Sequence, residues 1–207
     1  MADGNPEIKR GRKYDQVLEG AREVFLSSGF EGASVDEIAR AAGVSKATLY
    51  SYFPDKRQLF IEVTRAECKR QADLAMGQID LNQPMADLLA IGARLMIDQY
   101  LSDFGQNIYR ICVAESDRFP EIGRAFWETG PGLVRRTLVP VLQMGVARGE
   151  LRIEDFNLAA DQMNELCKAD LVHRVLFKVT DSVTEAEKAR VADGAVQMFL
   201  ARYGTEG

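Results

Sequence analysis

Side chains that can hydrogen-bond to nucleic acid gather in residues 45–52. Lysine and threonine can contact base edges, methyl groups of alanine or threonine can contact the thymine methyl, and tyrosine hydroxyls can bind phosphate oxygens. Leu49 and Phe53 lie four residues apart, so on a helix both would face inward together with Val44. The outer face would then consist of Lys46, Ala47, Thr48, Tyr50, Ser51 and Tyr52. Such a face suits a DNA groove, but a solvated helical hairpin in an all-α core has the same spacing.

Two short helices around a glycine turn must position this face. Ser34 and Glu37 have the spacing of a capping box, which starts a helix at the next residue. Gly43 can adopt the left-handed conformation that ends this helix. Ser45 is a favourable N-cap for a second helix, which Pro54 cannot continue. The sequence therefore predicts a helix-turn-helix unit.

A long motif extends over this unit. It reads Gly43-Val44-Ser45-Lys46-Ala47-Thr48-Leu49-Tyr50, followed by Tyr52-Phe53-Pro54-Asp55-Lys56 and Leu59. The motif resembles the DNA-binding signature of the TetR/AcrR family of one-component transcriptional regulators, and the resemblance covers roughly residues 12–60. A second, shorter segment, Arg118-Phe119-Pro120-Glu121 through Gly130-Pro131, resembles one AcrR-like subgroup.

The resemblance assigns roles to individual residues of this motif. It implies that Lys46, Ala47, Thr48 and Ser51 lie at or near base edges, and that Tyr50, Tyr52 and Lys56 mainly hold phosphates. Ser34 and Ser45 would add capping and backbone contacts at the two helix starts. Asp36 departs from the family, because some members place there an arginine that reads guanine, whereas a carboxylate repels phosphate. The operator sequence therefore cannot be read by analogy with those members.

The charge distribution fits a DNA-binding N-terminal part, although the net charge is −5. Residues 1–70 carry 12 basic and 11 acidic groups, and the remaining residues carry 14 basic and 20 acidic groups. Lys9, Arg10, Arg12 and Lys13 crowd the start of the first predicted helix, where cations oppose the helix dipole. We interpret them as an arm on the DNA backbone or in the minor groove. The alternative is a solvated basic terminus.

The sequence lacks the signals of several other protein classes. No segment is long and apolar enough to span a membrane, and the first residues do not start a signal peptide, so we expect a cytoplasmic protein. Cys68, Cys112 and Cys167 are far apart and odd in number, which argues against a disulfide framework. The single histidine, His173, has no neighbours at metal-ligand spacing and is expected in a core or interface. With no catalytic motif either, we expect no metal, no cofactor and no enzyme.

The apolar periodicity indicates an all-α fold. The resemblance implies a DNA-binding head of three helices over residues 1–55 and a larger helical domain for ligand binding and dimerisation over residues 56–207. The first helix is predicted to end before Gly29, and Pro140 to kink a later one. The predicted helices include residues 9–28, 56–79, 84–103 and 106–116, with two more between 120 and 149.

Two final helices are predicted over residues 154–179 and 184–203, each with a broad apolar face. Two such hairpins from two subunits can close a four-helix bundle. The resemblance implies that this bundle is a homodimer interface, and the alternative is that the same faces pack within one chain. The apolar residues of these faces are Leu158, Met163, Leu166, Leu171, Val175, Leu176, Val191, Ala195, Met198 and Phe199.

A cavity for an effector is also implied by the resemblance. Its candidate lining residues are Met96, Tyr100, Phe104, Tyr109, Phe126, Trp127 and His173. Methionine and aromatic side chains line adaptable apolar pockets, but they also fill ordinary cores. The effector would be a small apolar or amphipathic molecule.

The resulting hypothesis is a homodimeric repressor that binds a palindromic operator in double-stranded DNA and is released by a small-molecule inducer. An activator is the alternative within the same class. From another class, the chain could be an all-α small-molecule-binding or scaffolding protein with a vestigial DNA head.

Overall fold

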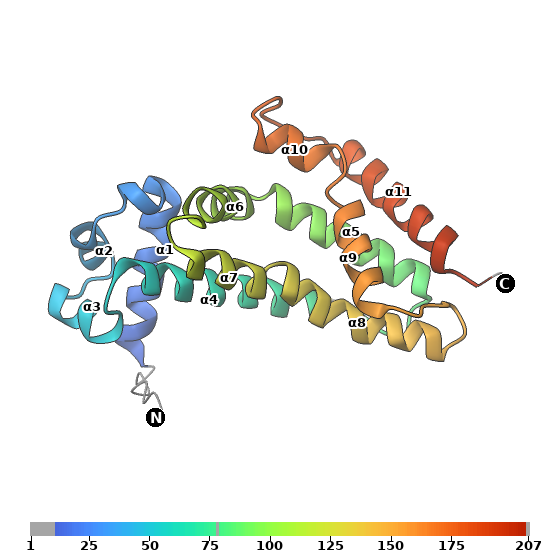
Figure 1. Cartoon of the computed structure of the whole chain (residues 1–207), viewed down its shortest axis with the longest axis horizontal. Coiled ribbons are helices and arrows are strands. Elements are labelled where there is room, and N and C mark those ends of the chain that lie inside the picture. The colour runs from blue at the N-terminus through green and yellow to red at the C-terminus, as the bar shows by residue number, and fades with distance from the viewer. Residues whose placement is uncertain (1–10, 78, 206–207) are drawn as a thin grey trace.

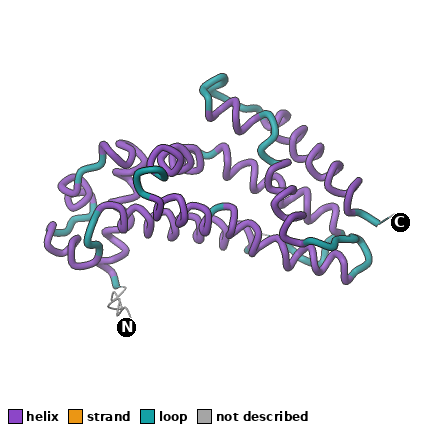
Figure 2. Tube along the Cα trace, viewed as in Figure 1, coloured by secondary structure: helices purple, strands orange, loops and turns teal. Residues whose placement is uncertain are grey.

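The computed structural model describes residues 11–77 and 79–205. This part of the chain is mainly helical (Figure 2). Leu151 and Gly204 form an isolated antiparallel bridge. Helices α1–α3 gather at one end of an elongated molecule, and α4 runs from them toward the other end beside α7 and α8 (Figure 1). The predicted all-α architecture is confirmed.

Eleven helices are formed by the described residues. The N-terminal four are α1 (Arg12–Gly32), α2 (Val35–Ala41), α3 (Lys46–Tyr52) and α4 (Lys56–Met76). The others are α5 (Met85–Leu101), α6 (Asp103–Glu115), α7 (Pro120–Thr129), α8 (Pro131–Ala147), α9 (Phe156–Leu166), α10 (Leu171–Leu176) and α11 (Glu185–Tyr203). Helix α8 continues past Pro140.

Buried apolar side chains form two cores. The first core combines α1–α4 with α6 and α7, and the second combines α5, α8, α9 and α11 with Leu171 of α10. Leu59 and Phe60 of α4 are buried in the first core together with Ile108 of α6 and Ile122 of α7. The domain boundary predicted at residue 55 therefore falls inside one continuous core.

Four phenylalanines join α1, α4 and α7, and we call them the aromatic junction: Phe25, Phe30, Phe60 and Phe119. The Phe60 ring centroid lies 5.2 Å from that of Phe25 and 5.3 Å from that of Phe30, both in edge contacts. Phe30 also meets Phe119, the N-cap residue of α7, edge-on at 6.1 Å. Such pairs are stabilised beyond their buried area, so the junction fixes α4 against the N-terminal helices.

Gly29 lets Phe30 reach this junction. Its φ of 69° and ψ of −178° interrupt the helical geometry of α1, and one further turn follows before Ala33. Glycine adopts a positive φ without the steric cost that a Cβ brings. The prediction that Gly29 ends the first regular helix is confirmed at this position.

The prediction of a single helix over residues 154–179 is wrong. This segment is divided into α9 and α10, and Asp170 between them has a φ of 62°. Aspartate is among the few non-glycine residues that tolerate a positive φ, and a positive φ interrupts helical geometry. The apolar periodicity continues across this turn, so the sequence pattern does not indicate the break.

Half of the ten apolar residues predicted for the faces of the last helices are buried within the chain. The buried members are Met163, Leu171, Val191, Ala195 and Phe199, all in the second core. The alternative of intramolecular packing therefore holds for these residues. Leu158 of α9 and Met198 of α11 remain 50% and 63% exposed.

Gly20 of α1 allows a close approach to the turn after α2. A Cβ built at Gly20 would lie 2.4 Å from the backbone nitrogen of Ala42. A Cβ at Gly92 of α5 would meet no atom within 4 Å. The helix-turn-helix is thus seated on α1 through a position where any side chain would overlap with backbone.

We predict that Gly20→Ala lowers the free energy of unfolding by about 1–3 kcal/mol, the usual cost of overpacking. Gly92→Ala is the matched control, because in open space alanine should raise it by up to about 1 kcal/mol through helix propensity. Denaturant unfolding of both variants measures the difference. Equal effects of the two substitutions would contradict the close seating.

Candidate functional site

Side-chain caps fix both helices of the helix-turn-helix. The Ser34 hydroxyl accepts from the Glu37 backbone N–H at 3.1 Å, and the Ser34 N–H donates to Glu37 Oε2 at 3.2 Å. The hydrogen bonds that the Ser34 N–H and hydroxyl donate to the Glu37 carboxylate lower the pKa of Glu37. Gly43 has a φ of 64°, and the Ser45 hydroxyl accepts from the Thr48 N–H at 3.1 Å. The predicted capping box, glycine turn and N-cap are therefore confirmed.

Helix α3 presents one polar face outward. Leu49 and the following Phe53 are buried, which confirms the predicted inner side. The exposed residues are Ser45, Lys46, Ala47, Tyr50 and Ser51, and Ser34 is exposed at the start of α2. Four side chains of α3 itself can therefore meet a groove without refolding.

Two predicted contacts are only half exposed. The Thr48 hydroxyl shares a hydrogen bond with the Ser45 hydroxyl at 2.9 Å. The Tyr52 ring packs edge-on against Tyr14 of α1 at 5.9 Å. Both side chains thus have structural contacts as well as an accessible part.

The Lys56 ammonium group caps the C-terminal end of α1. Its Nζ donates to the carbonyl oxygens of Phe30, Glu31 and Ala33 at 2.6, 3.3 and 3.1 Å. An ammonium group has three donors, and a cation stabilises a helix C-terminus. The structure gives Lys56 a capping role that the sequence prediction missed, and a phosphate contact would require this ammonium group to leave its carbonyls.

Asp36 of α2 forms an ion pair with Lys46, the first residue of α3. Both side chains are more than half exposed. The acid that departs from the family pattern therefore lies beside a predicted base-edge contact and neutralises its charge.

The described part of the predicted basic arm lies at the start of α1. Arg12 and Lys13 are exposed in its first turn. Lys9 and Arg10 lie outside the described residues.

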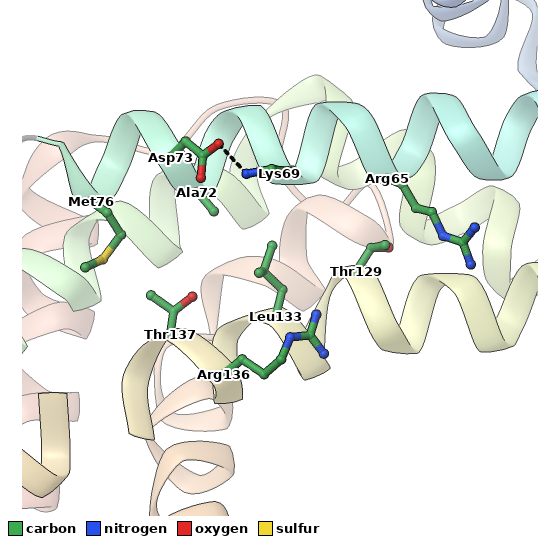
Figure 3. A pocket seen from close by; sticks show the side chains of 9 residues that line it. All are labelled: Arg65, Lys69, Ala72, Asp73, Met76, Thr129, Leu133, Arg136 and Thr137. Atoms are coloured by element: carbon green, nitrogen blue, oxygen red, sulfur yellow. Dashed lines mark hydrogen bonds and ion pairs between the residues drawn. The ribbon is translucent and has the colours of Figure 1, made fainter. Parts of the chain in front are cut away.

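A pocket of about 310 Å³ opens between α4, α7 and α8 (Figure 3). Its lining residues are Arg65, Lys69, Ala72, Asp73, Met76, Thr129, Leu133, Arg136 and Thr137. Arg65 and Lys69 are four residues apart, so the sequence places them on one side of α4. No local signal joins them to Arg136, because α8 meets α4 only in the fold.

The seven predicted cavity residues do not line this pocket. Phe104 is buried in the first core, Met96 and Tyr100 pack against the second, and Phe126 packs against the first. Trp127 is 55% exposed, and Tyr109 is exposed beside Phe126. His173, expected in a core or interface, is exposed in this chain and stacks on Phe177 at 6.1 Å. The structure therefore places these seven residues in different cores and on the surface, not around one cavity.

Burial favours the uncharged forms of the Tyr100 hydroxyl and the three thiols. The Tyr100 hydroxyl donates to Asn164 Oδ1, and burial raises the pKa of Tyr100. Burial also raises the pKa of Cys68 to about 11 and those of Cys112 and Cys167 to about 12. Thiols with such values are protonated near neutral pH and are poor nucleophiles. Within residues 11–77 and 79–205, no group of three His, Cys, Asp or Glu side chains could hold a metal ion.

Two family profiles match the chain. The profile described as bacterial regulatory proteins, tetR family, matches residues 17–63. The AefR-like transcriptional repressor C-terminal domain matches residues 86–205, more than half of the chain. The chain belongs to the TetR family of transcriptional regulators. In this TetR-family regulator the first profile spans the helix-turn-helix, and the second spans α5–α11 except for the first residue of α5.

Curated relatives have related descriptions. The HTH-type transcriptional repressor AcnR of Corynebacterium glutamicum is 26% identical over 180 residues, which are 87% of this chain and 82% of that protein. AcnR of Corynebacterium diphtheriae is 34% identical over 86 residues, so the match covers 42% of this chain and only 44% of that relative.

Solved structures of TetR-family proteins share the whole fold. A putative TetR-family transcriptional regulator from Mesorhizobium loti has a TM-score of 0.82 and 29% identity, covering 94% of this chain and 98% of that chain. The flavonoid-responsive regulator FrrA has a TM-score of 0.77 and 32% identity, covering 96% of this chain and 100% of that chain. None of the helices described for this TetR-family regulator has the length and apolarity to cross a membrane.

We predict that Asp36→Asn strengthens binding to DNA of any sequence, because the charge of the Lys46 ammonium group is then no longer neutralised by a carboxylate. One more uncompensated positive charge at the DNA should steepen the dependence of log affinity on log salt by about 0.9, the value for one neutralised phosphate. Binding titrations at several salt concentrations measure this slope.

The control compares Lys46→Gln with the double variant Asp36→Asn/Lys46→Gln. These two proteins should share one slope, since neither retains the ammonium group. A steeper slope in the double variant would show that Asp36 acts without Lys46.

Proposed function

We propose that this regulator is a homodimeric repressor that binds a palindromic operator through two α3 helices and is released by a small-molecule effector. The main support is the exposed polar face of α3. The Ser45 side chain caps the start of this helix, and the buried Leu49 anchors its inner side. A rigid short helix of this kind can enter the major groove with its side chains already placed. Two symmetry-related heads would read two symmetry-related half-sites.

The base-edge contacts in this proposal are Lys46, Ala47, Thr48 and Ser51, and Tyr50 and Tyr52 bind phosphates. Arg10, Arg12 and Lys13 follow the backbone or minor groove beside them. Ser34 and Ser45 contribute at the two helix starts. Lys56 keeps its place on the α1 carbonyls and supports the head from within.

Dimerisation is proposed through α9 and α11. Leu158 and Met198 are large apolar side chains left exposed on these two helices. Isolated exposed apolar residues are common, but one on each helix of a packed pair suits a four-helix interface. The buried residues of the same helices would support this surface from within the chain and would not contact the second subunit.

The pocket between α4, α7 and α8 is the proposed effector site. Helix α4 begins in the first core and lines the pocket with its C-terminal half. An effector that prefers another position of α4 would move the head and change the distance between the two α3 helices. Repression would then end because both heads no longer fit successive major grooves.

The test of the proposed function is selection of genomic DNA fragments by the purified protein at near-physiological salt, followed by footprinting. A protected symmetric site near a promoter is expected. The absence of any enriched sequence would favour the alternative of an all-α small-molecule-binding or scaffolding protein with a vestigial head. A promoter fusion in cells distinguishes repression from activation.

Tyr50→Phe tests the phosphate contacts. Loss of one hydrogen bond to a charged group should weaken binding to all duplexes by roughly 10-fold, with the fold unchanged because Tyr50 is 49% exposed. Tyr109→Phe is the matched control, an exposed tyrosine of α6 whose hydroxyl should not affect binding. Unchanged affinity of Tyr50→Phe would remove Tyr50 from the interface.

The double variant Leu158→Arg/Met198→Arg should be monomeric, because two buried cations per subunit would be unpaired in the interface. Sedimentation measures the mass, and operator affinity should fall with it. Val113→Arg, at a 58% exposed site on α6, is the control and should stay dimeric. A dimeric double variant would place the interface elsewhere.

A further inference from the structure

Cationic side chains from two helices line the pocket between α4, α7 and α8. Arg65 and Lys69 come from α4, and Arg136 comes from α8 on the opposite side (Figure 3). Asp73 is the one acidic residue among the nine that line the pocket, and its carboxylate pairs with Lys69 at 2.7 Å. The lining therefore carries three positive charges and one negative charge.

The two guanidinium groups have donors to spare. Arg136 donates to the Glu128 carbonyl oxygen at 2.7 Å and forms no ion pair with any described residue. Arg65 pairs with Glu62 at 2.9 Å and with Glu128 at 3.4 Å. A guanidinium has five N–H donors, so neither group is saturated by these partners.

Apolar surface lies next to these charges. Ala72 and Met76 of α4 and Leu133 of α8 line the same pocket. Its volume of about 310 Å³ is at the small end for ligand pockets. A ligand for this space would be small, with one charged end and one hydrocarbon end.

We propose that this pocket binds a small amphipathic organic carboxylate. The carboxylate lies between Arg136 and Arg65, where planar forks of donors match its two oxygens, and the hydrocarbon part covers Leu133 and Met76. This inference rests on the proposed function, in which the pocket receives the effector, and it specifies the effector's chemical class.

A shared carboxylate also supplies the coupling to the DNA head. The bound carboxylate contacts both Arg65 of α4 and Arg136 of α8, and it competes with Glu128 of α7 for Arg65. Phe60 of the aromatic junction lies five residues before Arg65 on the same helix. Ligand binding therefore changes the partners of the helix that holds the head.

The probes are phenylacetate, hydrocinnamate, octanoate and decanoate, each beside the alcohol of the same carbon skeleton. Calorimetry and the fluorescence of Trp127, the single tryptophan, report binding, because Trp127 precedes the lining residue Thr129 by two positions. We expect at least one carboxylate to bind about 10-fold or more tightly than its alcohol, as a charge-assisted hydrogen bond implies. Arg136→Gln should abolish this preference, and Arg124→Gln, at an exposed position of α7 outside the pocket, should keep it.

Three results would overturn the inference: equal affinity for acid and alcohol, unchanged acid binding by Arg136→Gln, or no saturable binding of any carboxylate. Inorganic phosphate that binds as tightly as the carboxylates would also overturn it, because the apolar part would then contribute nothing.

Selection of DNA fragments without any carboxylate separates this inference from the proposed function. If wild type and Arg136→Gln select the same operator but no carboxylate binds, the inference alone fails. If a carboxylate binds and no operator is selected, the proposed function fails and the binding site stands.

Discussion

The edge contacts of Phe60 with Phe25 and Phe30 are the interaction on which the arrangement of the molecule depends. They fix α4 against α1, and α1 in turn seats α2 and α3. Phe119 extends the same contact to α7, where the Arg57–Glu121 ion pair at 3.0 Å supports it. The head and the rest of the protein are therefore joined by packing and charge as well as by the chain, and movement of α4 is movement of the head.

Local features of the head were predictable from the sequence, because each depends on residues within one helical turn. The Ser34–Glu37 box, the Gly43 turn and the Ser45 cap follow from backbone groups that neighbouring side chains must satisfy. The inner side of α3 followed from the spacing of Leu49 and Phe53. The family resemblance then gave this unit a function that its spacing alone left open.

Features that depend on distant residues were not predictable in this way. Lys56 meets its carbonyl partners 23 to 26 residues earlier in the chain, so no local pattern reveals its capping role. The pocket unites α4 with α7 and α8, whereas the methionine and aromatic residues chosen for a cavity fill cores or lie on the surface. The break at Asp170 escaped detection because one residue in a left-handed conformation leaves the apolar periodicity on both sides intact.

In the proposed function, helix α3 separates folding from DNA recognition within seven residues. Leu49 provides its buried anchor, and Lys46, Ala47, Tyr50 and Ser51 are exposed. Exposed positions of this kind usually change folding free energy by less than about 0.5 kcal/mol when substituted. If these positions contact the operator as proposed, successive single mutations there change operator preference, and each leaves a folded protein for selection to act on.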